Sequence, residues 1–469
     1  MKTYDAIVIG GGPGGYPCTI KLGQLGLKTL CVEMDKPGGV CLNWGCIPSK
    51  ALIYAANQYE KATGDNAEIG IEAKEVTLDP NKLQDWKDGI VKRLTGGVSA
   101  LMKSAKADYL AGRGKLVSKD TVEVTLADGT TERVQATKGI VIATGATTVE
   151  IPSFKFDGKQ IIGAKEAVSL REIPRRLLVI GGGIIGLELG TVYQKLGSQL
   201  FVAEALPHLL GDTDPDCTRI VERKLKKHGA TIYKKALAKS YTKNPDGSLA
   251  VTIEVEGKPE VIEVDMVLVA VGMRPASKNL GLEEVGVTVD QRGFIPTDAR
   301  CATNVPGIYA VGDVSGPPLL AHKATKEGEI AAEVIAGHKA AKDWVGMPGA
   351  IFTDPEIASV GMSEAEAKDK GIEIKVGKFP FSVLGKAMAM RETDGFVKVI
   401  AHAESQQILG VHIVGPEASA QISEAALSLE MAAFVEDVML TVHPHPTLGE
   451  AYMEAAAHAI GQAIHIQNR

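Results

Sequence analysis

Residues 4–15 read YDAIVIGGGPGG, an apolar strand pattern that runs into a glycine-rich loop. A helical pattern follows over residues 16–26, and a second strand pattern, residues 28–33, ends on an acid. A strand, a GxGxxG turn, a helix and a second strand with a terminal acid are the parts of the βαβ unit that binds dinucleotides. One such turn alone is a weak signal, because glycine-rich turns are common.

The same pattern occurs a second time. Residues 176–186 read RLLVIGGGIIG, residues 187–196 have a helical pattern, and the strand pattern of residues 199–204 again ends on an acid. The alternative is that both segments are ordinary βαβ turns that bind no ligand. The matched register of the two copies makes this alternative the weaker one. At one offset of 171 residues, Gly10, Gly12, Gly15 and Glu33 correspond to Gly181, Gly183, Gly186 and Glu204.

Each position of this pattern has a physical role. The first glycine permits a tight turn, the second lets the backbone approach a pyrophosphate, and the third lets helix and strand pack closely. The helix N-terminus offers free N–H groups to the phosphates, and the acid accepts hydrogen bonds from ribose hydroxyls. Two such sites predict two dinucleotides held face to face, as an electron relay requires. Glu204 favours NAD over NADP, because its carboxylate would repel a 2′-phosphate and residues 201–212 contain no arginine.

The remaining patterns predict the architecture. After residue 351, strand patterns mix with helical patterns, which is typical of an α+β domain. We therefore expect an α/β fold with two Rossmann-like dinucleotide-binding domains and a C-terminal α+β domain. The predicted strands are residues 140–145, 265–272, 307–313, 396–400 and 408–414, and the predicted C-terminal helices are residues 417–434 and 448–463.

The composition narrows the class of protein. The chain has 469 residues, which predicts three or four domains, and its net charge is −6 with both signs spread along the chain. This charge argues against a nucleic-acid surface, and no apolar run is long enough to span a bilayer. The first strand pattern begins almost at the initiator Met, which leaves no room for a signal peptide. We expect a cytoplasmic protein, with a processed organellar protein as the open alternative.

Two of the six cysteines lie close together, in the segment GGVCLNWGCIPSK at residues 38–50. In a regular helix, a rise of about 7.5 Å would separate Cys41 and Cys46, and a disulfide needs closer Cα atoms. Gly45 and Pro48 allow the first turn of the predicted helix to distort and bring the sulfurs together. Six cysteines are too few for a disulfide-rich secreted scaffold of this length, so the pair indicates redox chemistry.

Local charge supports that interpretation. A helix N-terminus lowers the pKa of a thiol, and Lys50, four residues after Cys46, adds a positive charge on the same helical face. A structural disulfide or half of a zinc site are the alternatives. No second cysteine pair completes a zinc site, and the short loop would gain little stability from a disulfide.

A candidate base lies in the segment HPHPTLGE at residues 443–450. A thiol relay needs a base that holds a proton near neutral pH, and a carboxylate on one ring nitrogen orients a histidine for this role. His445 with Glu450 fits these roles. Thr447 with Glu450 also fits a capping box that needs no chemistry, so the spacing leaves both interpretations open.

These motifs together resemble the dihydrolipoamide dehydrogenases of the class I pyridine nucleotide–disulfide oxidoreductase family. The resemblance covers essentially the whole chain and rests on GGGPGG, GGVCLNWGCIPSK, GGGIIGLELG and the HxHPTxxE motif. It implies FAD in the first dinucleotide site, NAD in the second, and oxidation of protein-bound dihydrolipoyl groups by NAD. It also implies that Cys41 exchanges with the substrate, that Cys46 is the charge-transfer thiol beside the flavin, and that His445 acts from the neighbouring subunit of a homodimer.

The resemblance further implies domain boundaries and cofactor contacts. The domains are residues 1–150 for FAD, 151–275 for NAD, 276–348 completing the FAD site, and 349–469 for dimerisation. The implied FAD contacts are Gly10, Gly12, Gly15, Glu33, Lys50, Gly114, Thr144, Gly145, Asp313, Leu320, Ala321 and His322. The implied NAD contacts are Gly181, Gly183, Gly186, Glu188, Glu204 and Gly272. No metal is expected.

Partners and rival functions follow from the same resemblance. The expected partners are lipoyl domains and core subunits of 2-oxoacid dehydrogenase complexes, or a lipoylated carrier protein of glycine cleavage. An NADPH-dependent reductase of glutathione or mercury is the nearest rival, and Glu204 and the lack of a C-terminal cysteine pair weigh against it. A second rival is a docking subunit of a dehydrogenase complex that has lost its catalytic activity. The presence of Cys41, Cys46, His445 and Glu450 weighs against it.

Two residues depart from the family pattern. Pro17 falls in the early turns of the first phosphate-binding helix, where it is tolerable only if its N–H would be unpaired. Trp44 stands between the two cysteines, where we expect it to crowd the disulfide or its substrate channel.

Overall fold

The first sheet carries the first glycine-rich loop and combines distant parts of the chain. In a computed structural model, which describes residues 1–64 and 66–468, its strand order is β3-β2-β1-β6-β5-β4, and β17 pairs in parallel with the end of β6. β1, β2, β3 and β6 run parallel, and β5 pairs antiparallel with both of its neighbours, β6 and β4. The bounds are β1 Lys2–Ile9, β2 Thr29–Glu33, β3 Asp108–Ala111, β4 Arg113–Leu116, β5 Thr121–Thr125, β6 Thr131–Ile142 and β17 Ile308–Ala310.

Helices around this sheet include the two that carry the redox pair. Pro17 is the third residue of α1, within the first turn, where backbone N–H groups have no intrahelical acceptor, so the predicted tolerance is confirmed. In the described part of the chain, no helix has the length and apolar character needed to cross a membrane. The bounds are α1 Gly15–Gln24, α2 Gly39–Asn43, α3 Cys46–Thr63, η1 Ala67–Ile69, α4 Pro80–Ser104, η2 Gly312–Ser315 and α9 Ala321–Ile335.

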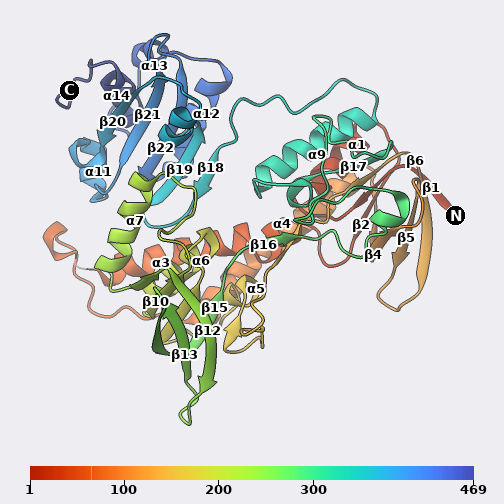
Figure 1. Ribbon diagram of the computed structural model, residues 1–469, viewed down its shortest axis with the longest axis horizontal. Coiled ribbons are helices and arrows are strands. Elements are labelled where there is room, and N and C mark those ends of the chain that lie inside the picture. The colour runs from red at the N-terminus through yellow and green to blue at the C-terminus, as the bar shows by residue number, and fades with distance from the viewer. Residues whose placement is uncertain (65, 469) are drawn as a thin grey trace.

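The second sheet repeats the parallel arrangement of the first. Its order is β11-β10-β9-β15-β8, and the antiparallel sheet β12-β13-β14 adjoins it in the lower part of Figure 1. A short pairing of β7 with β16 joins the start and the end of this domain. The bounds are β7 Ala146–Thr148, β8 Ile161–Ile162, α5 Ala164–Ala167, β9 Arg176–Ile180, α6 Ile184–Lys195, β10 Gln199–Glu204, α7 Pro215–Lys227, β11 Thr231–Lys234, β12 Ala236–Lys243, β13 Leu249–Val255, β14 Lys258–Val264, β15 Met266–Val269, β16 Met273–Pro275 and α8 Leu282–Val285.

The C-terminal domain is α+β, as predicted, and lies at the upper left of Figure 1. Its antiparallel sheet has the order β18-β19-β22-β21-β20. The predicted helix 417–434 is too long, because the chain takes a left-handed conformation at Ala432 (φ 52°). The bounds are β18 Gly349–Ile351, β19 Glu356–Gly361, α10 Glu364–Asp369, β20 Ile374–Pro380, η3 Phe381–Val383, α11 Gly385–Met390, β21 Phe396–His402, β22 Ile408–Gly415, α12 Ala418–Glu430, α13 Val435–Leu440 and α14 Glu450–Ala459.

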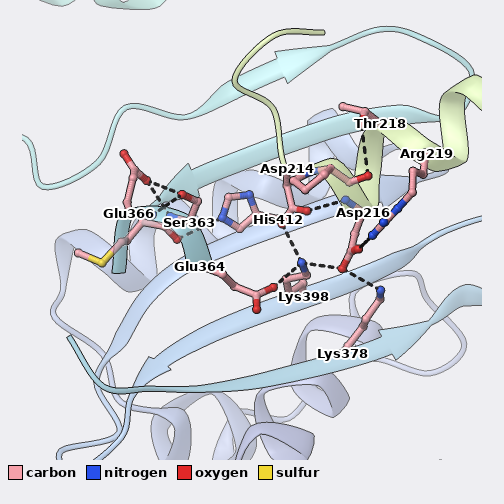
Figure 2. Close-up of polar contacts among 12 residues, drawn as sticks. Asp214, Asp216, Thr218, Arg219, Ser363, Glu364, Glu366, Lys378, Lys398 and His412 are labelled. Atoms are coloured by element: carbon pink, nitrogen blue, oxygen red, sulfur yellow. Dashed lines mark hydrogen bonds and ion pairs between the residues drawn. The ribbon is translucent and has the colours of Figure 1, made fainter. Parts of the chain in front are cut away.

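A buried ionic cluster joins the second domain to the C-terminal sheet (Figure 2). Lys398 of β21, whose side chain is 3 % exposed, donates to Asp214 at 2.8 Å and to Glu364 at 2.6 Å and pairs with Asp216 at 2.9 Å. Burial alone would lower the pKa of Lys398, but the hydrogen bonds to these carboxylates raise it above its usual value. The lysine therefore stays charged inside the interface.

Replacing Lys398 with methionine is expected to lower the free energy of unfolding by about 3–5 kcal/mol, because it leaves the buried Asp214 carboxylate without its cation. The urea midpoint of unfolding is the measurement. Lys226→Met is the control, because the ion pair of Lys226 with Glu222 on α7 is exposed and its loss costs about 0.5 kcal/mol. Equal midpoints for the two variants would contradict the prediction.

Candidate active site

The two glycine-rich loops have the same backbone geometry. Gly10 and Gly181, which directly follow β1 and β9, have φ of 106° and 105°. A Cβ at Gly10 would lie 2.3 Å from the Ala143 carbonyl oxygen, and one at Gly181 would lie 2.5 Å from that of Ala270. Only glycine fits either turn, so the predicted repeat is a repeat of structure.

The second and third glycines of each loop differ in what surrounds them. A Cβ at Gly15 would meet the Gly10 carbonyl oxygen at 1.7 Å, and one at Gly186 would meet that of Gly181 at 2.2 Å. These third glycines are required by the packing of helix on strand. A Cβ at Gly183, in contrast, would meet no described atom within 4 Å. The backbone at this second glycine is therefore open on one side, where a pyrophosphate could approach it.

The terminal acids of the two copies make matching hydrogen bonds. Glu33 accepts from the backbone N–H of Gly11 at 2.6 Å, and Glu204 accepts from that of Gly182 at 2.6 Å. Each carboxylate also accepts from the N–H two residues further on, at 2.8 Å in the first copy and 2.7 Å in the second. Both acids are therefore held beside their loops, with lone pairs left for ribose hydroxyls.

The redox segment lies directly on the first loop. Gly38 donates its N–H to the Gly11 carbonyl oxygen at 2.8 Å. A Cβ at Gly39 would lie 2.6 Å from Gly12 Cα, so the two backbones touch. Cys41 follows on α2, which places the cysteine pair next to the first dinucleotide site.

The two cysteines do not share one helix. The prediction of a single distorted helical turn is wrong in detail, because α2 ends before Trp44 and α3 begins at Cys46. Gly45 forms the break, where a Cβ would lie 3.2 Å from Cys41 Cα and 3.0 Å from the Val40 carbonyl oxygen. Glycine at this position lets the two helix ends approach. The half-buried Trp44 packs on a hydrophobic cluster, and its expected crowding of the disulfide stays a prediction.

The electrostatic environment separates the two thiols. A hydrogen bond from Cys41 is the largest influence on Cys46; burial opposes it and the charge of Lys50 assists it, so the pKa of Cys46 falls to about 7. The same hydrogen bond and burial raise the pKa of Cys41. When the pair is reduced, Cys46 is therefore the thiolate near neutral pH and Cys41 carries the proton.

Lys50 and Glu188 join the redox helix to the second dinucleotide site. Lys50 Nζ donates to Glu188 Oε2 at 2.7 Å, and Glu188 is buried on α6, the helix that follows the second loop. The resemblance implied Lys50 at the flavin and Glu188 at the nicotinamide. In the structure these two side chains are in direct contact. The cysteine pair thus lies between the two dinucleotide loops.

Asp313 has the surroundings expected of a cofactor ligand. Burial is the main cause of a raised pKa at Asp313, and no hydrogen bond from a described residue reaches its carboxylate. Its η2 turn is held by Glu327, which accepts from the Gly312 N–H at 2.8 Å, and by the buried Lys323, which donates to the Gly316 carbonyl oxygen at 2.8 Å. Sequence reasoning missed Lys323 and Glu327; their i,i+4 spacing after LLAH was the available signal.

The other predicted contacts lie on a strand, on turns and at a helix start in both dinucleotide domains. Gly114 is buried on β4, where a Cβ would meet Ile9 of β1 and Val32 of β2. Thr144 donates its hydroxyl to the Ala276 carbonyl oxygen at 2.8 Å, which fixes the Gly145 turn. Further predicted contacts are Leu320, Ala321 and His322 at the start of α9, and Gly272 just after β15.

His445 and Glu450 are brought together. His445 Nδ1 lies 2.8 Å from Glu450 Oε1, while Glu450 Oε2 accepts from the Thr447 N–H at 2.7 Å. Burial would raise the pKa of Glu450, but these hydrogen bonds and the His445 charge lower it. The Thr447 hydroxyl donates to the Pro444 carbonyl oxygen rather than capping α14, so only the glutamate half of the alternative capping box is formed.

The two motif histidines differ in exposure. The His443 side chain is 5 % exposed and lies between Glu424 and the Thr441 carbonyl oxygen, at 2.9 Å from each. The His445 side chain is 78 % exposed. Figure 1 shows α14 separated from α3 by the C-terminal sheet. His445 lies just before α14, and α3 begins at Cys46. One chain therefore does not bring this histidine to its own cysteines.

Apolar side chains are exposed on the same domain as His445. They lie on or next to α12 and α13, and exposed apolar clusters of this kind mark protein interfaces. The exposed residues are Leu427, Met431, Phe434, Leu440 and Val442.

The fold and the site define an oxidoreductase with two dinucleotide sites and a cysteine pair between them. The chain belongs to the pyridine nucleotide-disulphide oxidoreductase family, whose model matches residues 4–328, and the model of that family's dimerisation domain matches residues 347–456. Membership implies FAD and a nicotinamide dinucleotide as cofactors, and the dimerisation domain indicates a homodimer.

The curated relatives cover nearly the whole chain. A dihydrolipoyl dehydrogenase of Thermus scotoductus is 48 % identical over 100 % of both chains, and one of Geobacillus stearothermophilus is 45 % identical over 98 % of this chain and 97 % of its own. The mitochondrial enzyme of Sus scrofa is 44 % identical over 99 % of this chain and 94 % of its own. LpdA of Mycobacterium tuberculosis has a similar structure, with a TM-score of 0.89, 25 % identity, and coverage of 97 % and 99 %.

Proposed function

We propose that this protein is a dihydrolipoyl dehydrogenase that oxidises protein-bound dihydrolipoyl groups with NAD. The observation that carries the proposal is the position of the cysteine pair. Gly39 packs on Gly12 of the first loop, and Lys50 pairs with Glu188 beside the second. The full-length likeness to dihydrolipoyl dehydrogenases supports the choice of substrate.

The chemistry at the sulfurs is a thiol–disulfide exchange. A substrate thiolate attacks the Cys41–Cys46 disulfide at Cys41 and releases Cys46 as a thiolate, whose low pKa makes it a good leaving group. The second substrate thiol then displaces Cys41, so the dihydrolipoyl group leaves as a disulfide and the enzyme pair holds its two electrons. His445 of a second copy accepts the proton from the substrate thiol, with Glu450 holding its ring.

The proposed cofactor sites follow the two loops. FAD would be held by the first loop, Glu33, Lys50, Gly114, Thr144, Gly145, Asp313 and residues 320–322. NAD would be held by the second loop, Glu188, Glu204 and Gly272. Flavin and nicotinamide, when bound, supply the onward two-electron transfer. The proposed domains are residues 1–150, 151–275, 276–348 and 349–469.

The proposed partners carry lipoyl groups: the core subunits of 2-oxoacid dehydrogenase complexes or a lipoylated carrier protein. The likeness to dihydrolipoyl dehydrogenases supports them. An NADPH-dependent reductase is disfavoured by Glu204, because its carboxylate is held beside the second loop and would repel a 2′-phosphate.

Purified protein is expected to be yellow and to form NADH when given dihydrolipoamide and NAD. NADP should be used at least about 100-fold less efficiently in kcat/KM, because the Glu204 charge repels the added phosphate. Glu204→Gln is the matched variant: it keeps an oxygen for the Gly182 N–H and removes the charge, so the preference for NAD should fall about tenfold. Faster turnover of glutathione disulfide or mercuric ion with NADPH would favour the rival function.

A further inference from the structure

Two polar side-chain contacts, called cross-links below, join helices α3 and α6, and they are separated by the same number of residues on both helices. Lys50 donates to Glu188 at 2.7 Å, and seven residues later on each helix Lys195 donates to Asn57 at 2.8 Å. Lys195 also pairs with Glu60 at 2.7 Å, and its side chain is 4 % exposed. The equal interval means that the two helices run in the same direction, with one polar contact near the cysteines and the other farther along.

The first residues of the C-terminal domain contact both cross-links. Phe352 donates its N–H to Glu188 Oε1 at 2.9 Å. Two residues later, the Asp354 carboxylate accepts hydrogen bonds from Lys195 and from Lys224 of α7. The segment 352–354 therefore fastens the helix that carries Lys50 and the helix that carries Glu188 to the C-terminal domain.

Phe352 touches both members of the pair nearest the cysteines. Its N–H holds one carboxylate oxygen of Glu188 while Lys50 holds the other. Its ring lies 4.4 Å from Lys50 Nζ, so the face of the ring attracts the ammonium group. We infer that Phe352 is a positioning residue of the redox site, which holds Lys50 and Glu188 in the pairing that faces Cys46.

This pairing controls the charge at Cys46. The Lys50 ammonium favours the Cys46 thiolate, and the Glu188 carboxylate disfavours it. The net field at the sulfur therefore depends on which of the two groups lies closer. Phe352 sets that balance, because its ring attracts Lys50 and its N–H fixes Glu188. A leucine at this position would keep the N–H but lose the attraction of the ring for Lys50. The importance of the balance for turnover rests on the proposed function.

The test measures thiolate formation at Cys46 directly. In the reduced holoprotein with Cys41→Ser, the rate of alkylation by iodoacetamide is followed against pH. Phe352→Leu is expected to move the midpoint of the profile upward by about half a pH unit, because a cation–π contact has been lost. Phe352→Tyr keeps the ring and should restore the parent profile. Should Phe352→Leu fail to fold, Phe352→Met gives the same comparison with an unbranched side chain that adapts its shape to the space.

A second lysine–phenylalanine contact provides the control. Lys378 Nζ lies 3.7 Å from the Phe396 ring in the C-terminal sheet, so Phe396→Leu removes the same kind of contact elsewhere. This control should leave the Cys46 profile unchanged. An unchanged profile in Phe352→Leu, or an equal shift in Phe396→Leu, would overturn the inference. Alkylation needs no lipoyl substrate, so failure of the parent protein to oxidise dihydrolipoamide would count against the proposed function alone.

Discussion

Replacing Cys46 with serine is expected to reduce dihydrolipoamide turnover by roughly 10³-fold or more. A hydroxyl cannot form the disulfide that accepts the substrate electrons, and it is not ionised at neutral pH as the Cys46 thiol is. Cys41→Ser should have an effect of the same size, because each sulfur is one half of a single two-electron acceptor. Steady-state NADH formation from dihydrolipoamide is the measurement.

Cys217→Ser is the matched control for the cysteine variants. Cys217 is a free, buried cysteine on α7, so this variant makes the same chemical change away from the redox pair. It should retain turnover, and all three variants should remain yellow. Persistence of lipoamide turnover in Cys46→Ser or Cys41→Ser would exclude the proposed chemistry.

Replacing His445 with glutamine should lower kcat with dihydrolipoamide by about 10²- to 10⁴-fold, because the proton acceptor is removed. Glutamine retains a donor for Glu450, so the loop before α14 should keep its conformation. His443→Gln is the control, because His443 is buried against Glu424 and its side chain does not reach the surface. The control should change kcat by less than about tenfold.

Mixed dimers distinguish a histidine acting across the interface from one acting in its own chain. Suppose that each active site takes Cys46 from one chain and His445 from the other. A dimer of one Cys46→Ser chain and one His445→Gln chain then has one site in which both Cys46 and His445 are intact. Random mixing of the two inactive variants should then restore about one quarter of parent activity, since about half the dimers are mixed and each has one of two sites. No recovery in confirmed mixed dimers would contradict the exposure argument for His445.

The features predicted best from the sequence are those fixed by local geometry. The third glycine of each loop is required by a close contact with the first glycine of the same βαβ unit, so the offset between Gly10 and Gly181 predicted both units correctly. The break at Gly45 was predicted only as a distorted turn, because the separation of α2 from α3 depends on the packing of Gly39 against the first loop.

The contacts that sequence reasoning missed join residues far apart in the chain. Phe352 meets Glu188 and Lys50 only because three domains come together, and no periodicity near Phe352 signals this. The buried Lys398 was not predicted either, since its partner Asp214 lies 184 residues away. Such pairs depend on domain packing, which a local pattern does not encode.

The pairing of β17 with β6 has a consequence for biosynthesis. The first sheet receives its last strand from residues 308–310, after the whole second domain has been made. A nascent chain that has reached only residue 300 therefore has an unfilled place beside the end of β6, and the η2 turn that carries Asp313 does not yet exist. The amino-terminal domain, although translated first, is therefore completed after its neighbour.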